Sequence, residues 1–190
     1  MTLKKPRNAG WIVTPEKFLR SEQVNILRHC LELGRASGDR YAVRNAAIIE
    51  TLLGTGLRVS ELCALVVGDL FLEAGSAQVV VRNGKGGRAR LVPIGGLLAK
   101  YLRHYLAWKS QQGEGTGSGD AVFLSERGTG ITRSAVHRIW KQALADAGLP
   151  TRWGVHSTRH SYAVEIYRRT KDLRLTQKVL GHSSPSITQI

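Results

Sequence analysis

The chain has 190 residues, 42% of them hydrophobic, which suits one packed domain and argues against wholesale disorder. Twenty-eight Lys and Arg against fourteen Asp and Glu give a formal net charge of +14, which favours a polyanionic partner, most commonly nucleic acid. No apolar run approaches the ~18–20 residues of a membrane-spanning helix, and two cysteines cannot build a disulfide framework. We therefore expect a cytoplasmic protein with no membrane partner, no metal and no small-molecule cofactor.

The first third of the chain predicts an arm followed by helices. Residues 1–13 are basic and interrupted by proline and glycine, so we expect a basic arm or linker there. A helix begins either at residues 14–16 or at residues 21–23, both of which have cap-like sequences, and ends near residue 34. A second helix is expected over residues 41–53, where two glycines break it, and a short helix opens at Ser60. Arg58 then lies at a corner between two helices.

The rest of the chain predicts one small sheet and more helices. Residues 78–81 and 88–94 are β-like and flank a glycine-rich turn, so we expect a hairpin with Lys85 at its tip. Residues 113–120 read as a flexible loop. Further helices are expected over residues 97–108, 132–147, 156–169 and 173–180, with a short piece after residue 185. The predicted fold class is mainly α with a small antiparallel β-sheet (α+β).

Five basic residues lie in short patterns whose chemistry suits a phosphodiester. They are Arg58 in T-G-L-R-V-S-E-L, Lys85 in G-K-G-G-R, His156 and Arg159 as an H-x-x-R pair, and His182 in L-G-H-S-S. Guanidinium groups stay charged and donate paired hydrogen bonds, so two arginines can hold the oxygens of an attacked phosphate without a metal. A lysine on a glycine-rich turn can protonate the leaving oxygen, and a histidine can shuttle a proton near neutral pH.

In this combination and order, the patterns resemble the catalytic domain of the tyrosine recombinase (phage integrase) family over residues 14–190. The roles that the resemblance implies are phosphate binding for Arg58, Arg159 and His182, general-acid catalysis for Lys85, assistance to proton transfer for His156, and support of Arg58 by Glu61. His160, next to Arg159, is expected to support the site rather than to react. On charge alone, DNA-backbone contacts are expected from Arg82, Arg88, Arg90, Arg133, Arg138 and Arg152.

The family's nucleophile is a tyrosine on a short helix after the last histidine of the site. None of the five tyrosines of this sequence matches that place, and the chain ends at Ile190 just before it. We therefore expect a catalytic domain cut short before its nucleophile, without the N-terminal domain that completes the family's clamp on DNA. Tyr162, one turn after Arg159, is expected to pack in the core beside the site.

Four functions remain open at this point. The first is a site-specific recombinase domain that cuts and rejoins double-stranded DNA through a 3′-phosphotyrosyl link, with self-association in a synaptic complex. The second is a catalytically silent relative that acts as a DNA-binding module at recombination sites. A type IB topoisomerase shares the site chemistry, but the L-G-H-S-S pattern fits recombinases better. RNA binding would explain the charge but not the ordered patterns.

Overall fold

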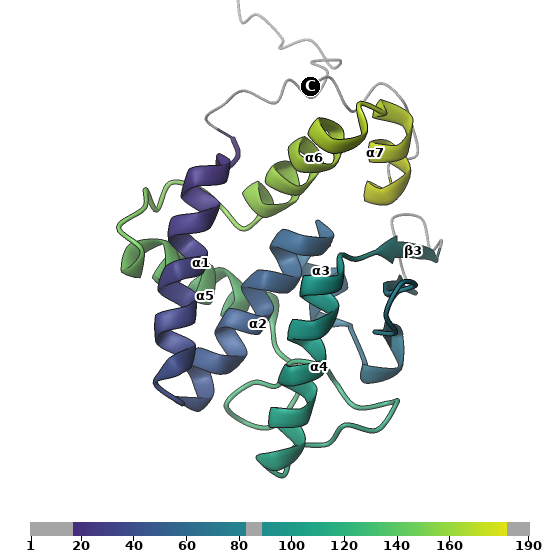
Figure 1. Cartoon of the computed structure of the whole chain (residues 1–190). Coiled ribbons are helices and arrows are strands. Elements are labelled where there is room, and N and C mark those ends of the chain that lie inside the picture. Colours follow the sequence, from purple (N-terminus) through teal and green to yellow (C-terminus); the bar gives the residue numbers. More distant parts are fainter. Residues whose placement is uncertain (1–16, 83–88, 182–190) are drawn as a thin grey trace, which may run out of the picture.

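The computed structural model describes residues 17–82 and 89–181. Helices surround a central helix on several sides, and a small sheet lies at one edge (Figure 1). The elements are α1 (Ser21–Ala36), α2 (Arg40–Thr55), α3 (Val59–Cys63), the 3-10 helix η1 (Val67–Asp69), β1 (Leu70–Phe71), β2 (Gln78–Val81), β3 (Arg90–Pro93), α4 (Gly96–Gln111), α5 (Arg133–Asp146), α6 (His156–Thr170) and α7 (Leu173–Leu180). The expected mainly α fold with a small antiparallel sheet is confirmed.

The central helix is α2, which packs against α1, α4, α5 and α6. Its apolar side chains, Ile48, Ile49 and Leu52 among them, are buried around its whole circumference, as expected of a helix enclosed by others. The carboxylate of Asp39 accepts a hydrogen bond from the Ala42 amide at 2.7 Å and caps the first turn. Gly56, with φ of +61°, ends the helix in the left-handed conformation.

The sheet has three antiparallel strands in the order β1-β2-β3, one more than the sequence predicts. The strand β1 has only two residues, too few to show an alternating pattern. In the register of β2 and β3, Val79 pairs with Val92 and Val81 pairs with Arg90. Directly paired residues point to the same face, and the three valines are buried, so Arg90 points to the buried face of the sheet.

The connection from residue 113 to residue 120 contains no helix or strand, as predicted, but hydrogen bonds tie it to its surroundings. The Asp120 side chain accepts from the Gly117 amide at 2.7 Å, and the Asp120 carbonyl accepts from the Val67 amide at 2.9 Å. The ammonium group of the buried Lys109 donates a hydrogen bond to the Gly115 carbonyl. Across the described ranges, no helix has the length and apolar character to cross a bilayer.

At one end of the molecule, α6 packs on α2 and α7, and α7 packs on β3 (Figure 1). The first turn of α6 therefore lies near the corner where α2 gives way to α3. This meeting point brings together residues that are far apart in sequence, and it is where the predicted site residues are found.

Candidate active site

Arg58 lies at the corner between α2 and α3, as predicted. Gly56 turns the chain out of α2, and Arg58 immediately precedes the first residue of α3. Its amide donates to Glu61 Oε2 at 2.8 Å, and its Nη1 donates to Glu61 Oε1 at 2.7 Å. The side chain is 27% exposed, so the guanidinium is reachable from solvent while one N–H is held by Glu61.

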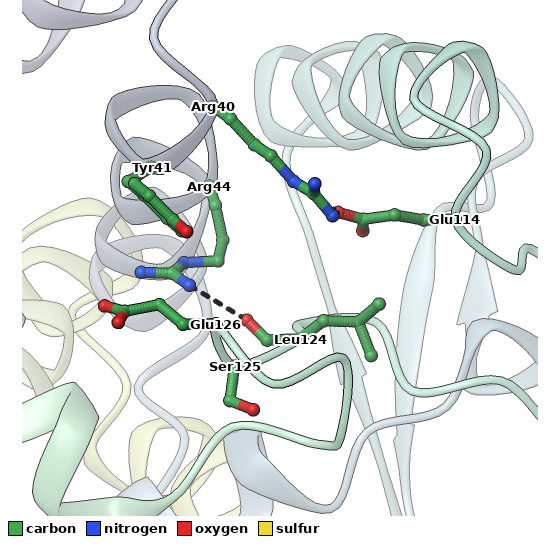
Figure 2. A pocket seen from close by; sticks show the side chains of 7 residues that line it. All are labelled: Arg40, Tyr41, Arg44, Glu114, Leu124, Ser125 and Glu126. Atoms are coloured by element: carbon green, nitrogen blue, oxygen red, sulfur yellow. Dashed lines mark hydrogen bonds and ion pairs between the residues drawn. The ribbon is translucent and has the colours of Figure 1, made fainter.

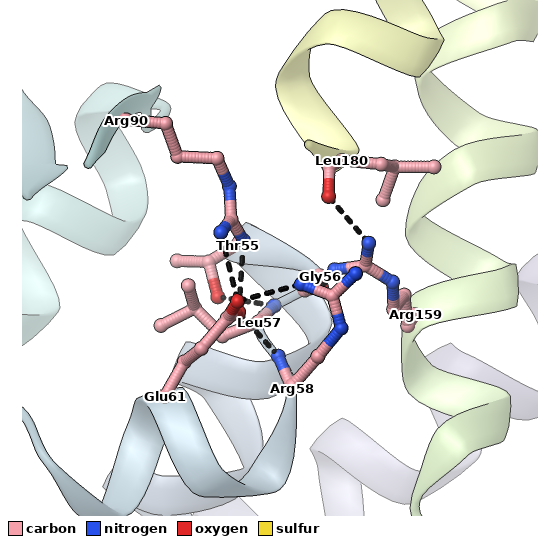
Figure 3. Close-up of polar contacts among 8 residues, drawn as sticks. All are labelled: Thr55, Gly56, Leu57, Arg58, Glu61, Arg90, Arg159 and Leu180. Carbon is pink, nitrogen blue, oxygen red and sulfur yellow. Dashed lines mark hydrogen bonds and ion pairs between the residues drawn. The ribbon is translucent and has the colours of Figure 1, made fainter. Parts of the chain in front are cut away.

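Glu61 also binds Arg90, which the charge of the sequence suggests as a DNA-backbone contact but which the fold directs to this carboxylate. Arg90 of β3 donates Nη1 to Oε1 and Nη2 to Oε2 of the same carboxylate, both at 2.8 Å (Figure 3). Burial raises the pKa of Glu61, but the hydrogen bonds from Arg90 and Arg58 outweigh it and lower that pKa to about 2. Glu61 therefore accepts two hydrogen bonds from Arg58 and two from Arg90, and its role in supporting Arg58 stays a prediction.

Arg159 comes from the first turns of α6 and is almost entirely enclosed, with 1% of its surface exposed. Its Nη1 donates to the Gly56 carbonyl at 2.7 Å, and its Nη2 donates to the Leu180 carbonyl (Figure 3). These carbonyls lie at the C-terminal ends of α2 and α7, where backbone acceptors lack helical partners and carry partial negative charge. Burial, and then the positive charge of Arg58, lowers the pKa of Arg159 to about 9, so it stays charged at pH 7.

Arg58 and Arg159 thus share one region, but not as two open donors side by side. Arg58 faces solvent, whereas atoms of the fold cover Arg159. The expected grip of both arginines on phosphate oxygens requires these covering atoms to move aside. In the present arrangement Arg159 contributes its charge from a position where water screens it little.

His156 is the first residue of α6 and is exposed. Desolvation of the ring, followed by the charges of Arg159 and Arg58, lowers the pKa of His156 from its ordinary value of 6.5, so the ring is neutral at pH 7. His160, one turn later, is buried and packs edge-on against His156 with ring centroids 4.9 Å apart. The supporting role of His160 stays a prediction.

Two predicted site residues, Lys85 and His182, lie outside the described residues. The tyrosine nearest the site is Tyr162, which is buried, with its pKa raised to about 12, mainly by desolvation. Its ring lies so close to Gly56 that a Cβ there would be 2.4 Å from Tyr162 Cδ1. The prediction that Tyr162 packs in the core is confirmed.

The sequence did not predict that Arg90 belongs to the site as a partner of Glu61, with a side chain only 12% exposed. The signal lies in the alternation of R-L-V-P-I, which places Arg90, Val92 and Ile94 on one face of β3, and both apolar members are buried. The arginine on such a face needs a buried acidic partner, and a pattern of charge alone cannot supply it.

The three arginines and Glu61 form a cluster with a surplus of charge. Arg58, Arg90 and Arg159 carry three positive charges, and Glu61 carries one negative charge, which leaves +2. Such a cluster attracts an anion, and a phosphodiester is one that guanidinium donors fit well. Within residues 17–82 and 89–181, no group of three or more His, Cys, Asp or Glu residues is arranged to hold a metal ion.

A separate group of arginines lines a small pocket at the opposite end of α2, about 20 Å along the helix axis (Figure 2). Arg40 pairs with Glu114 at 2.7 Å, and Arg44 donates to the Leu124 carbonyl at 3.1 Å. Glu126 lines the same pocket and acts on Arg44 by its charge. Two acids therefore face two arginines, and this pocket has no surplus positive charge.

Comparisons by sequence and by fold both find tyrosine recombinases among the proteins similar to this chain. The model of the phage integrase family matches residues 17–190. Tyrosine recombinase XerC of Roseiflexus castenholzii is 41% identical over 162 residues, which cover 84% of this chain and 50% of that protein. Tyrosine recombinase XerD of Oceanobacillus iheyensis is 38% identical over 152 residues, with coverages of 80% and 50%. The chain spans about half the length of the curated relatives it matches.

Among solved structures, the crystal structure of the XerA recombinase has a TM-score of 0.74 and 30% identity, over 88% of this chain and 57% of that chain. The XerH site-specific recombinase, bound to its palindromic difH substrate in a post-cleavage complex, has a TM-score of 0.73 over 89% of this chain and 47% of that chain. At 24% identity the XerH comparison supports the fold alone. The family match over nearly the whole chain and the XerC and XerD similarities show that this chain belongs to the phage integrase family of tyrosine recombinases.

Proposed function

We propose that this chain is the phosphate-binding catalytic domain of a site-specific recombinase that cuts and rejoins double-stranded DNA. The observation that carries the proposal is the surplus of positive charge around Glu61, with Arg58 exposed enough to meet a DNA phosphate. Arg58 contacts the scissile phosphate first, and Arg159 stabilises the charge that develops on its oxygens. His156, neutral at pH 7, accepts or passes a proton beside them.

The proposal extends to the two predicted residues outside the described ranges. By the family resemblance, Lys85 protonates the leaving oxygen and His182 binds the phosphate. None of the five tyrosines in the sequence fits the nucleophile's place, so we propose that it is supplied from outside these 190 residues or by a second protomer. We also propose that the protein self-associates in a synaptic complex and that a separate N-terminal domain completes the clamp on DNA. Residues 1–13 are proposed to be a basic arm or linker.

The first test is DNA binding and covalent capture by the chain as it stands. It should bind mixed-sequence duplex DNA with an affinity that falls steeply with salt, because it releases counterions from phosphates. On nicked duplexes of randomised sequence, it should form no covalent adduct on a denaturing gel. A DNA-linked band would contradict our assignment of the nucleophile.

The second test supplies a tyrosine, either by continuing the chain with its native residues or by adding a tyrosine-bearing helix. The extended protein should capture nicked duplexes covalently, and Arg58→Ala should abolish capture while most of the DNA binding remains. Arg28→Ala is the matched control, because Arg28 is also paired with an acid, Glu50, yet lies in no proposed DNA or catalytic contact. Equal loss of binding and capture in Arg58→Ala would mean that Arg58 only holds the DNA backbone.

A catalytically silent DNA-binding module is the second candidate. The enclosure of Arg159 favours it, since a covered guanidinium makes no direct contact with a phosphate. The extended protein distinguishes the two functions. If it folds, binds DNA and captures nothing from a substrate pool that a relative of the family cleaves, the silent module is the better description.

A further inference from the structure

We propose that Arg90 is a positioning residue that keeps Arg58 available to phosphate by occupying the carboxylate of Glu61. This inference rests on the proposed function, because it assigns separate roles to the arginines of that same phosphate site. Arg90 itself does not reach the DNA. It acts through Glu61, and Glu61 acts through Arg58.

Glu61 accepts as many hydrogen bonds as its carboxylate can hold. Each of its oxygens receives two: Oε1 from Nη1 of Arg58 and Nη1 of Arg90, and Oε2 from the Arg58 amide and Nη2 of Arg90. An ionised carboxylate has about four lone-pair positions. Glu61 is therefore saturated, and Arg58 cannot give it a second guanidinium N–H without displacing Arg90.

Arg90 is fixed in place by its position in the sheet and its packing as well as by its ion pair. Its residue lies in β3 on the buried face, opposite Val81. Its aliphatic stem passes over Gly181, where a Cβ would lie 2.9 Å from Arg90 Cδ. Among the described residues its Nε has no hydrogen-bond acceptor, so the polar attachment of this side chain is to Glu61. The packing of the stem and the two hydrogen bonds of the guanidinium fork, Nη1 and Nη2, together hold this group against the carboxylate.

Without Arg90, Glu61 loses half of its hydrogen-bond donors. Two acceptor positions of a buried carboxylate fall vacant, and buried acceptors rarely stay without a donor. The other guanidinium already bonded to Glu61 is that of Arg58, which is only partly enclosed. Arg58 then closes on Glu61 with two parallel N–H groups, a geometry that arginine and carboxylate favour. One more of its five N–H groups is then directed to Glu61 and is lost to a phosphate.

The test measures the affinity of the 190-residue chain for inorganic phosphate. The cross-peak of Arg58 Nε–H in a nitrogen–proton NMR spectrum, assigned by its loss in Arg58→Lys, reports binding at that side chain. Arg90→Met keeps the stem over Gly181 but removes the fork, and should weaken the phosphate affinity about tenfold, which is the value of one charge-assisted hydrogen bond. Arg90→Lys keeps the charge with a single donor group and should fall between Arg90→Met and the wild type.

The decisive variant is the double substitution Arg90→Met/Glu61→Gln. It restores the net charge of +2 and removes the carboxylate that would capture Arg58, so the affinity should recover to within about threefold of the wild type. A packing role for Arg90 predicts the reverse, since a second change in a damaged core adds to the first. The inference is wrong if Arg90→Met binds phosphate like the wild type, or if the double variant is weaker than Arg90→Met.

The outcome is separable from that of the proposed function. If the phosphate series behaves as expected but the tyrosine-bearing protein captures no DNA, the function is wrong and the role of Arg90 stands. If the Arg58 cross-peak does not move with phosphate even in the wild type, the role of Arg90 is wrong whatever the capture assay shows. Should Arg90→Met fail to fold, Arg90→Lys and the double variant still decide between the two interpretations.

Discussion

Three arginines surround one carboxylate at the corner between α2 and α3, whereas two arginines face two carboxylates at the other end of α2 (Figures 2 and 3). Both groups use arginine–carboxylate pairs at 2.7–2.8 Å. They differ in their balance of charge. The corner cluster keeps a surplus of +2, and the Arg40–Arg44 group keeps none.

The difference shows that an ion pair by itself does not mark a site. Arg40 and Arg44 attach residues 114–126 to α2. The nearby carboxylates of Glu114 and Glu126 balance the two positive charges. At the corner, Glu61 organises two arginines and neutralises only one charge, so the remainder is free to attract an anion. Four changes, from the largest expected effect to the smallest, test this contrast.

The largest effect is expected from Arg159→Leu. The substitution leaves the carbonyls of Gly56 and Leu180 buried without a donor, each of which costs roughly 1–3 kcal/mol, so we expect a loss of about 3 kcal/mol in the free energy of unfolding. The charge itself contributes little stability, because burial and Arg58 already disfavour the charged form. Urea denaturation measures the loss.

The control for this substitution is Arg169→Leu on the same helix. Arg169 is 74% exposed and pairs with Glu165 at the surface, so its replacement should change the free energy of unfolding by less than about 0.5 kcal/mol. Equal losses in the two variants would mean that the bonds from Arg159 to the ends of α2 and α7 do not stabilise the fold. Because Arg159 has this structural role, Arg58→Ala is the cleaner probe of catalysis.

The next effect is a dependence on acid that Glu61→Gln should remove. The folded-state pKa of Glu61, about 2, lies below its ordinary value of 4.5, so the ionised carboxylate stabilises the folded state. That contribution is fully present above pH 4.5 and is lost as the pH falls towards 2, and it amounts to about 3 kcal/mol. Urea unfolding at pH 5 and pH 2 should show a smaller difference in Glu61→Gln than in the wild type. An unchanged difference would mean that Glu61 is not held by its arginines.

Local patterns account for much of what the sequence predicts correctly. Glycines at the end of α2 and a short apolar helix after them are enough to place Arg58 at a corner, and the three-residue spacing from Arg58 to Glu61 brings the pair together. The later helices follow from their periodicity. These features depend on residues within one or two turns of each other, which a single sequence displays directly.

The missed features all depend on distant partners. Arg159 binds backbone carbonyls, which every residue has. The sequence therefore contains no side chain that would identify Gly56, 103 residues away, as its partner. The pairing of Arg90 with Glu61 spans 29 residues and requires the register of β3 to be known. Charge alone therefore suggests a DNA-backbone contact for Arg90, although the alternation with Val92 and Ile94 points to the buried face.

A smaller effect is expected from Gly181→Ala. With φ of +67°, an alanine there costs about 1–2 kcal/mol in backbone strain alone. Its methyl group would also lie 2.9 Å from Arg90 Cδ, and Arg90 cannot retreat without losing Glu61. Gly148→Ala is the matched control, because φ is +64° there and no atom lies within 4 Å of the added methyl. A larger loss in thermal stability for Gly181→Ala, together with weaker phosphate binding, would locate the difference at Arg90. Identical behaviour of the two variants would exclude a role for that contact.

The smallest effect is expected from Arg40→Ala, which removes one positive charge from the balanced group. Arg40 is 53% exposed, and exposed pairs of this kind contribute less than about 1 kcal/mol, so the free energy of unfolding should change little. Arg58→Ala removes the same charge from the three arginines around Glu61, and only that variant should weaken the binding of inorganic phosphate, measured by calorimetry, and abolish covalent capture. Equal losses of phosphate affinity in the two variants would show that the overall charge of +14, rather than the arrangement around Glu61, attracts the phosphate.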